Sequence, residues 1–543
     1  MFKRDSVLSF RSGFILSIIL ALFSLALSAL IPRCHISIST LTYGYLADTV
    51  HMVRDGNLNN SDPDWLVQGT RFPFADPLNN RAMNAVEPFG YNMVLAPPVF
   101  LRIDPIHCAL LVNIISISLS IVLFYFICAF WFRPAAALGI SAIFAFNPLF
   151  LQVNSVLALE PLFVFTTLAA TFFLLRRYIN YNRPSVGIAI LLGFLVTLPV
   201  YVRYIGIVFT AVSIFYVISE TFLRRETKGV FREAFALIAT SATLVVVLIA
   251  HNYAVSGVAS GNPIGLTPAY TFSGALFHML TDICMDSRFP LPIFFLSYSL
   301  RIIPSFLISA VLLSVLLLAS VRYRALRIFA WFTGAYVIAF AVAESITRID
   351  LINGRFIYPV IPFLVLGTFL LVRKAPTLLP SQRLGKILTV CFVLICSASI
   401  LPSVSEIVRG GQVESNYSPQ TVRAVMSSFS PNEHIFVNRF GAQINIYRPD
   451  LRSHMVPFID PANGHFTEAY GTHLLSRNEF IDEMKIFGIR KMVFCLGFTG
   501  NGDFFLNDDY YGAFMKDIFS GHDPLVESIQ FLPDGRIITL RNK

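Results

Sequence analysis

The stretch FILSIILALFSLALSALIP, from Phe14 to Pro32, contains no charged residue and is long enough to cross a lipid bilayer as a single helix. A secretory signal peptide has a shorter apolar core and ends at a cleavage site made of small residues. Here the apolar run is longer, and IPRCH follows it without such a site. We therefore expect a membrane anchor that the protein retains.

The rest of the chain continues this pattern. Hydrophobic residues make up 55% of the 543 positions and charged residues only 13%, which is outside the range of soluble globular proteins. This composition predicts a polytopic α-helical membrane protein. Dividing the chain at its charge clusters and prolines predicts about eleven transmembrane helices, at 14–32, 108–131, 135–152, 160–177, 186–202, 204–222, 233–251, 302–320, 326–343, 356–373 and 387–403.

The positions of Lys and Arg predict the orientation, because cytoplasmic loops of membrane proteins are enriched in both. With the N-terminus in the cytoplasm, positive residues gather in the cytoplasmic segments and are sparser, per residue, in the opposite loops. Eleven spans then place the C-terminal segment outside the cytoplasm. The net charge of +9 is explained by this topology, so we expect no nucleic acid partner.

Polar residues concentrate in three regions, which define the domain organisation. We expect a membrane domain at 1–402, with a first outer loop at 33–107 and a second at 252–301, and a small soluble α/β domain at 403–543 outside the membrane. In that domain, TVRAVMSSF and EFIDEMKIFGI have helical spacing, HIFVN and KMVFCLGF are typical of strands, and VESIQFLPDGRIITLRN predicts two strands around a turn. A helix followed closely by a buried strand favours a parallel or mixed sheet.

Acidic residues and Arg at the edge of a membrane domain are costly unless they pair, face water or have a function. Four such clusters fall on the predicted outer face. In LTYGYLADTVHMVRDGN (41–57) the apolar spacing predicts a helix along the membrane surface, with Asp48 near one edge. The other clusters contain Glu87 and Tyr91 in EPFGYNMVLAPP, Glu160 in NPLFLQVNSVLALEPLF, and Arg203 in VRYIG together with Arg348, Asp350 and Arg355 in TRIDLINGRFIYP.

Each cluster also has a structural explanation. Asp48 is equally compatible with a solvated acid on an interfacial helix. Glu160 stands in the first turn of its predicted helix beside a proline, where an acid stabilises the helix dipole. Arg203 and Arg355 are explained equally well as anchors that extend from span ends to the membrane interface.

The order of these segments resembles the GT-C glycosyltransferases, the membrane enzymes related to protein O-mannosyltransferases and lipid A aminoarabinose transferases (glycosyltransferase family 39-like proteins). The matching pieces are an anchor helix followed by LTYGYLADTVHMVRDGN, EPFGYNMVLAPP, NPLFLQVNSVLALEPLF, GFLVTLPVYVRYIG and GRFIYPVIPF, which together cover roughly residues 10–375. Each motif is weak by itself, and their order and spacing carry the resemblance.

The resemblance implies an enzyme that takes a sugar from a polyprenyl-phosphate donor and passes it, with inversion, to a lipid, glycan or protein acceptor outside the cytoplasm.

The transfer is expected to invert the configuration of the anomeric carbon of the sugar. Asp48 is the expected base, which takes the proton of the acceptor hydroxyl. Arg355 first, and Arg203 next, are expected to bind the leaving phosphate, because the planar Arg side chain holds phosphate oxygens through two bonds. Glu87, Tyr91 and Glu160 are the remaining substrate-binding candidates. A divalent cation, Mg²⁺ or Mn²⁺, is left open as a cofactor, and no other cofactor is expected.

Two other classes of protein remain open. A transporter of glycan or lipid intermediates would also be polytopic, although transporters place polar residues near the midplane and contain two similar halves. A non-catalytic membrane scaffold with a folded outer domain is the second alternative. Short cytoplasmic loops and the outer α/β domain favour a bacterial inner membrane, with the N-terminus in the cytoplasm.

Overall fold

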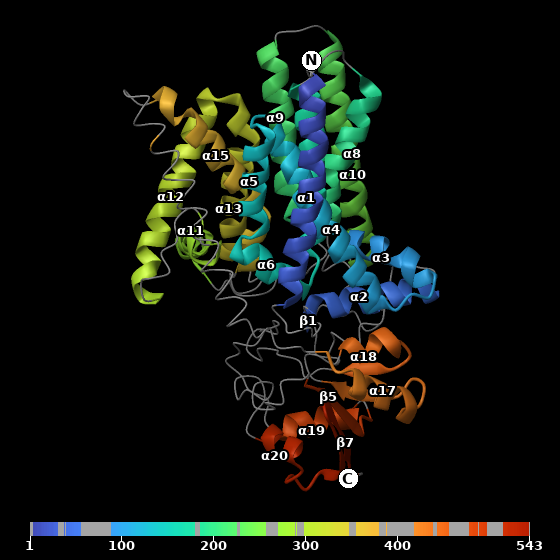
Figure 1. Cartoon of the computed structure of the whole chain (residues 1–543). Helices are drawn as coiled ribbons and strands as arrows, with labels where there is room; N and C mark the ends of the chain where they lie inside the picture. Colours follow the sequence, from blue (N-terminus) through green and yellow to red (C-terminus); the bar gives the residue numbers. More distant parts are fainter. Residues whose placement is uncertain are drawn as a thin grey trace.

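The computed structural model describes residues 4–30, 37–38, 40–55, 88–179, 185–224, 228–256, 270–287, 289, 298–346, 354–378, 387, 417–437, 442–454, 477–486, 488–496 and 514–541. These residues form a bundle of long helices and, beyond one end of it, a smaller unit built on a β-sheet (Figure 1). We call that end of the bundle the sheet-side end. The N-terminus lies at the opposite end (Figure 1).

The bundle is an integral, multi-pass membrane domain. Six helices in the described part of the chain are long and apolar enough to cross a membrane, or seven if one bent pair counts as a span, and three shorter apolar helices accompany them. The predicted span at 387–403 falls outside the described residues, apart from position 387. The bundle helices are α1 (Arg4–Leu30), α4 (Pro105–Ala129), α5 (Pro134–Ala145), α6 (Pro148–Asn154), α7 (Glu160–Ile179), α8 (Val186–Val202), α9 (Gly206–Arg224), α10 (Lys228–Ser256), α12 (Tyr298–Arg322), α13 (Arg327–Ile346) and α15 (Ile361–Leu378).

The single span predicted at 135–152 is instead two helices, α5 and α6, bent by 59°. Pro148 explains the break, because proline has no N–H and disfavours the helical conformation of the residue before it. Asn147 then caps α6 by accepting hydrogen bonds from the backbone N–H groups of Leu149 and Phe150 at 3.1 and 3.3 Å. Its Nδ2 also donates to the carbonyl oxygen of Ser287 at 2.8 Å, which fixes α6 to α11 (Phe272–Ser287).

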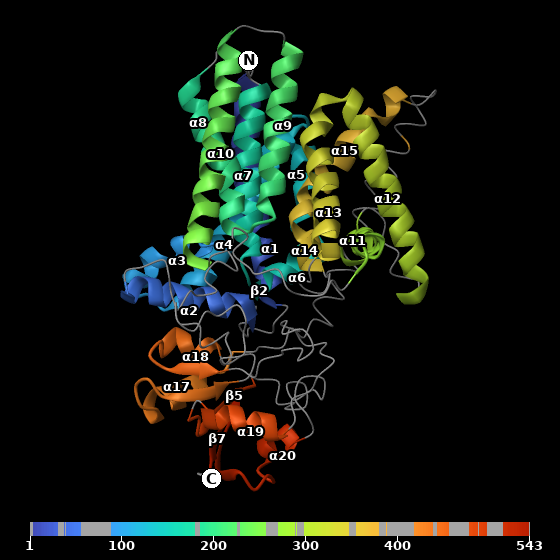
Figure 2. The ribbon, with the colours of Figure 1, turned by 180° about the vertical axis from the view of Figure 1, so that it is seen from behind.

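Shorter elements cover the sheet-side end of the bundle. The surface helix predicted around Asp48 is present as α2 (Thr40–Asp55), which lies across the axes of the bundle helices (Figure 2). Two further helices are not evident from the sequence pattern: α3 (Gly90–Phe100), and α11, which also runs crosswise (Figure 2). The remaining short elements are β1 (Ser37–Ile38), β2 (Val156–Leu157), α14 (Gly354–Ile357) and the 3₁₀ helices η3 (Arg324–Leu326) and η4 (Tyr358–Val360).

The C-terminal unit contains a five-stranded mixed sheet in the order β4-β3-β5-β7-β6. β3 pairs in parallel with β4 and β5, whereas β7 is antiparallel to β5 and β6. The strands and the turn predicted from HIFVN, KMVFCLGF and VESIQFLPDGRIITLRN are present. The elements are α17 (Pro419–Ser428), β3 (His434–Val437), α18 (Ala442–Tyr447), β4 (Arg452–His454), α19 (Arg477–Ile486), β5 (Lys491–Cys495), α20 (Phe514–Ser520), β6 (Val526–Leu532) and β7 (Gly535–Leu540).

Both faces of this sheet are covered, which explains why MVFC, at positions 492–495, is apolar without alternation. Met492 and Phe494 pack into one hydrophobic cluster, and Val493 and Cys495 pack into another. Asp534, in the turn between β6 and β7, accepts hydrogen bonds from the backbone N–H groups of residues 420 and 421 at 2.7 and 2.9 Å. This carboxylate therefore caps α17 and joins the sheet to its covering helix.

Candidate functional site

The candidate site lies where two segments that are far apart in the sequence contact each other. β1 and β2 form a short parallel ladder, in which Ser37 lies opposite Val156 and Ile38 lies opposite Leu157. The hydroxyl of Thr42 also donates to the carbonyl oxygen of Leu157 at 3.0 Å. Because β1 leads into α2 and β2 leads into α7, the start of the helix that carries Asp48 lies beside the start of the helix that carries Glu160.

The inner face of α2 is tightly packed. Tyr45, Leu46 and Ala47 are at most 5% exposed, and the ring of Tyr45 meets that of Tyr91 edge to face, with centroids 5.4 Å apart. Asp48 itself is half-buried. This position suits an acid that must be held in place and still reach a substrate.

Glu160 and Arg203 form a buried ion pair. Arg203 Nη1 donates to Glu160 Oε1 at 2.8 Å, and the two residues are only 8% and 3% exposed. Arg203 directly follows α8 and Glu160 begins α7, so the pair joins the ends of two bundle helices. Arg203 points into the protein, and Glu160 balances its charge.

The second candidate Arg lies close to this pair. The guanidinium carbon of Arg355 is 4.8 Å from the ring centroid of Phe356, and that of Arg203 is 5.5 Å from the same ring. Phe356 therefore connects the two Arg side chains predicted to bind phosphate. A Cβ atom at Gly354 would come within 2.5 Å of Leu149 Cδ1 and 2.8 Å of a carboxylate oxygen of Asp286, so α14 packs closely on α6 and α11 and a larger residue would displace these side chains.

Three buried tyrosines surround Glu160, and each lies within electrostatic range of its carboxylate: Tyr91, Tyr336 and Tyr358. The hydroxyl of Tyr358 donates to Asn154 Oδ1 at 2.8 Å. Within the described residues, the hydroxyls of Tyr91 and Tyr336 make no hydrogen bond. Burial, and to a lesser degree the charge of Glu160, raises the pKa of Tyr91, which keeps this hydroxyl protonated as a donor.

Some of these residues were missed by the sequence analysis. Tyr336 lies in the middle of an apolar helix, and nothing in the neighbouring sequence marks it as functional. Tyr358, in contrast, lies three positions after Arg355 in the motif GRFIYPVIPF, which could have indicated it. Asp282 and Asp286 were also missed, one helical turn apart on α11. Burial, and then the charge of Asp286, raises the pKa of Asp282 to about 7.

Glu87, Arg348 and Asp350 lie outside the described residues. His107 hydrogen-bonds Asp104 through Nδ1 at 3.0 Å, at the start of α4. Among the residues that the structure describes, no three His, Cys, Asp or Glu side chains are grouped so that they could hold a metal ion.

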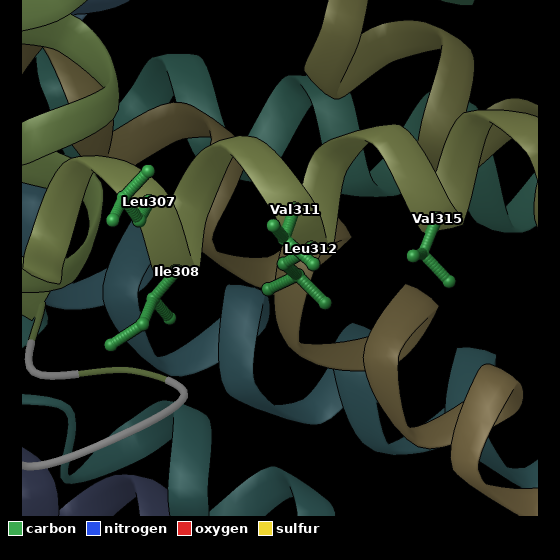
Figure 3. A pocket seen from close by; sticks show the side chains of 5 residues that line it. All are labelled: Leu307, Ile308, Val311, Leu312 and Val315. Atoms are coloured by element: carbon green, nitrogen blue, oxygen red, sulfur yellow. The ribbon is translucent and has the colours of Figure 1, made fainter.

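A groove of about 410 Å³ runs along α12 and is lined only by apolar side chains (Figure 3). Its lining residues are Leu307, Ile308, Val311, Leu312 and Val315. Such a surface suits contact with lipid chains and offers no group for acid, base or phosphate chemistry. The charged residues at the sheet-side end therefore remain the candidate site.

Comparison with known proteins gives similarity of structure alone. No family model and no curated protein matches the chain. The apo structure of ArnT from Cupriavidus metallidurans matches with a TM-score of 0.52 and 12% identity, over 97% of this chain and 98% of that chain. The apo oligosaccharyltransferase of Archaeoglobus fulgidus matches with a TM-score of 0.54 and 12% identity, over 92% of this chain and 71% of that chain. The chain therefore has the GT-C fold, as its sequence motifs predicted.

Proposed function

We propose that this protein is a membrane glycosyltransferase, which transfers a sugar from a polyprenyl-phosphate donor to an acceptor hydroxyl with inversion. The observation that supports this proposal best is the grouping of Glu160, Arg203, Phe356 and Arg355 at the end of the bundle where the Asp48 helix lies. The acceptor is a lipid, a glycan or a protein, and the reaction takes place on the extracytoplasmic face of the membrane.

In the proposed reaction, Asp48 accepts the proton of the acceptor hydroxyl as the acceptor oxygen attacks the anomeric carbon. The bond from that carbon to the phosphate oxygen breaks, and its electron pair leaves with the polyprenyl phosphate. Attack on the face opposite the leaving group inverts the anomeric centre, as in inverting glycoside hydrolysis.

The developing negative charge on the phosphate requires a fixed cation, and we assign this role to Arg355. Arg203 is the next candidate, and its guanidinium also holds the carboxylate of Glu160 at 2.8 Å. We assign to Arg203 the orientation of Glu160 and of the Phe356 ring. Tyr91 and Glu160 bind sugar hydroxyls in this proposal, and Glu87 remains a candidate for the same role.

The proposal is tested by Asp48→Asn in protein reconstituted into lipid with a polyprenyl-phosphate sugar. Loss of the base is expected to slow transfer by about 10²- to 10⁴-fold, while expression and thermal stability stay close to those of the wild type. Asp55→Asn, at the last residue of the same helix, is the matched control and is expected to retain activity. Unchanged transfer by Asp48→Asn would favour a scaffold or transporter.

The sugar and the acceptor are identified by profiling glycans and lipids in cells that lack the protein. The profile is expected to lose one sugar from one class of acceptor, and Asp48→Asn is expected not to restore it. Transfer from a nucleotide sugar in the absence of polyprenyl phosphate would contradict the proposed donor. Comparing transfer in EDTA with transfer in Mg²⁺ or Mn²⁺ decides whether a divalent cation takes part.

A further inference from the structure

We propose that the C-terminal unit positions the Asp48 helix, and that Tyr447 is the residue through which it does so. This inference rests on the proposed function of Asp48. It starts from the packing of α18 against α2, which places the C-terminal unit directly beside the candidate site (Figure 1).

The contact contains an apolar part. Ile446, on α18, is 2% exposed and belongs to the same hydrophobic core as Tyr45 and Leu46 of α2. Tyr417 and Tyr447 pack against that core from the C-terminal unit. The main core of the membrane domain therefore extends into the C-terminal unit, which distinguishes this contact from a loose surface contact.

The contact also contains a specific polar anchor. The hydroxyl of Tyr447 donates to Asp104 Oδ2 at 3.0 Å. The other carboxylate oxygen of Asp104 caps α4, because it accepts from the N–H groups of Ile106 and His107 at 3.0 and 3.1 Å. Burial above all, with the hydrogen bond to Tyr417, raises the pKa of Tyr447 and keeps it a neutral donor. Tyr447 therefore ties α18 to a fixed point of the bundle.

Charged residues next to α18 add an electrostatic attraction to the hydrogen bond of Tyr447. Arg448 donates to both carboxylate oxygens of Asp450, at 2.8 and 2.6 Å, directly after α18. Arg448 above all, and more weakly Arg54 of α2, hold the pKa of Asp450 below its usual range. Asp450 therefore presents a negative charge toward the positive residue in the last turn of α2.

The opposite side of α2 is fastened to the membrane domain. Asn92 Nδ2 donates to the carbonyl oxygen of Tyr45 at 3.4 Å, and Thr42 bonds Leu157 as described above. α2 thus lies between α3 and α18, and its position depends on both. Release of α18 is expected to loosen α2 and move Asp48 away from its working position.

Tyr447→Phe tests this inference, with Tyr417→Phe as the matched control. Tyr417 lies in the same cluster, with its hydroxyl 3.4 Å from that of Tyr447, but the control leaves the Tyr447–Asp104 bond in place. Loss of one hydrogen bond is expected to speed amide exchange in peptides covering 40–55 by about fivefold, while Tyr417→Phe exchanges like the wild type. In the transfer assay, Tyr447→Phe is expected to lower kcat by a similar factor and leave the KM for the donor unchanged.

Unchanged exchange at 40–55 in Tyr447→Phe would overturn the inference whether or not the protein is a glycosyltransferase, because this measurement needs no substrate. Faster exchange with an unchanged kcat would also overturn it, since α2 would then move without consequence for Asp48. Retained transfer by Asp48→Asn, in contrast, contradicts the proposed function. If Tyr447→Phe does not fold, Ile446→Val shortens the apolar part of the same contact and is measured in the same way.

Discussion

Arg203 illustrates how a neighbour changes the chemistry of a single residue. In the sequence it is an Arg at the end of an apolar segment, which suits either phosphate binding or an anchor at the membrane interface. In the structure its side chain is buried against Glu160 and lies over the ring of Phe356. A buried charge is tolerated only when it is paired, so each partner of this ion pair requires the other.

The expected result is strong coupling between the two residues. Removing one partner by Glu160→Gln or Arg203→Met leaves an uncompensated buried group and is expected to cost about 3–5 kcal/mol of stability. The double variant is expected to lose much less than the sum of the single variants. Thermal unfolding of all four proteins in detergent measures this coupling.

The control for this cycle is the ion pair between Lys491 and Glu433, whose atoms are 3.0 Å apart and whose side chains are 28% and 23% exposed. Solvent screens this pair, so Glu433→Gln and Lys491→Met are expected to couple by no more than about 1 kcal/mol. Coupling at Glu160 and Arg203 that is no larger than this value would show that the buried pair is not required for stability.

At the scale of elements, α11 carries two acidic residues that no sequence motif indicated. It lies crosswise beside α6 and α14, and Asp282 and Asp286 occupy one side of it, one helical turn apart. Burial disfavours the charged form of Asp282, and the nearby charge of Asp286 disfavours it further. This explains why the pKa of Asp282 is raised to about 7.

A raised carboxyl pKa makes stability depend on pH. Because the folded-state pKa of Asp282 lies above the value of about 3.9 in an unfolded chain, the contribution of this residue to stability is most favourable below pH 4 and becomes less favourable as the pH rises to about 7. Asp282→Asn removes this dependence. The variant is therefore expected to unfold at a higher temperature than the wild type at pH 8, with a smaller difference at pH 5. A difference that does not grow between pH 5 and pH 7 would contradict the raised pKa.

At the scale of the whole molecule, the bundle has two chemically different ends. The N-terminus lies at one end, and the candidate site and the C-terminal unit lie at the other (Figure 1). The distribution of Lys and Arg along the sequence predicts that the first end is cytoplasmic. The candidate site would then face the compartment in which polyprenyl-phosphate sugars are used by the proposed reaction.

Labelling with a membrane-impermeant maleimide in intact cells or spheroplasts tests this orientation. A cysteine at the exposed Ser528 of β6 is expected to react, and a cysteine at the exposed Arg322 at the end of α12 is expected to react only after permeabilisation. The four cysteines in the described residues are buried and are expected to react little, and the labelling of the wild type is subtracted as the contribution of the protein's own cysteines. The opposite pattern would invert the proposed topology.

The sequence by itself determined the class of protein, the surface helix around Asp48 and the elements of the C-terminal sheet. These features depend on local periodicity and on burial in lipid or in a sheet, which the apolar pattern records directly. Its ordered motifs also indicated the GT-C fold. It did not reveal the bend of α5 and α6 as two helices, although Asn147-Pro148 marks the position.

Only the tertiary structure decided which residues meet. The pairing of Glu160 with Arg203, the contact of Arg203 with Phe356, and the anchor from Tyr447 to Asp104 join positions 43 to 343 residues apart. Contacts at such separations depend on how helices pack around a common core, and a local pattern of residue types does not encode that packing. The sequence therefore determined which residues were available for chemistry, and the packing of the helices decided their partners.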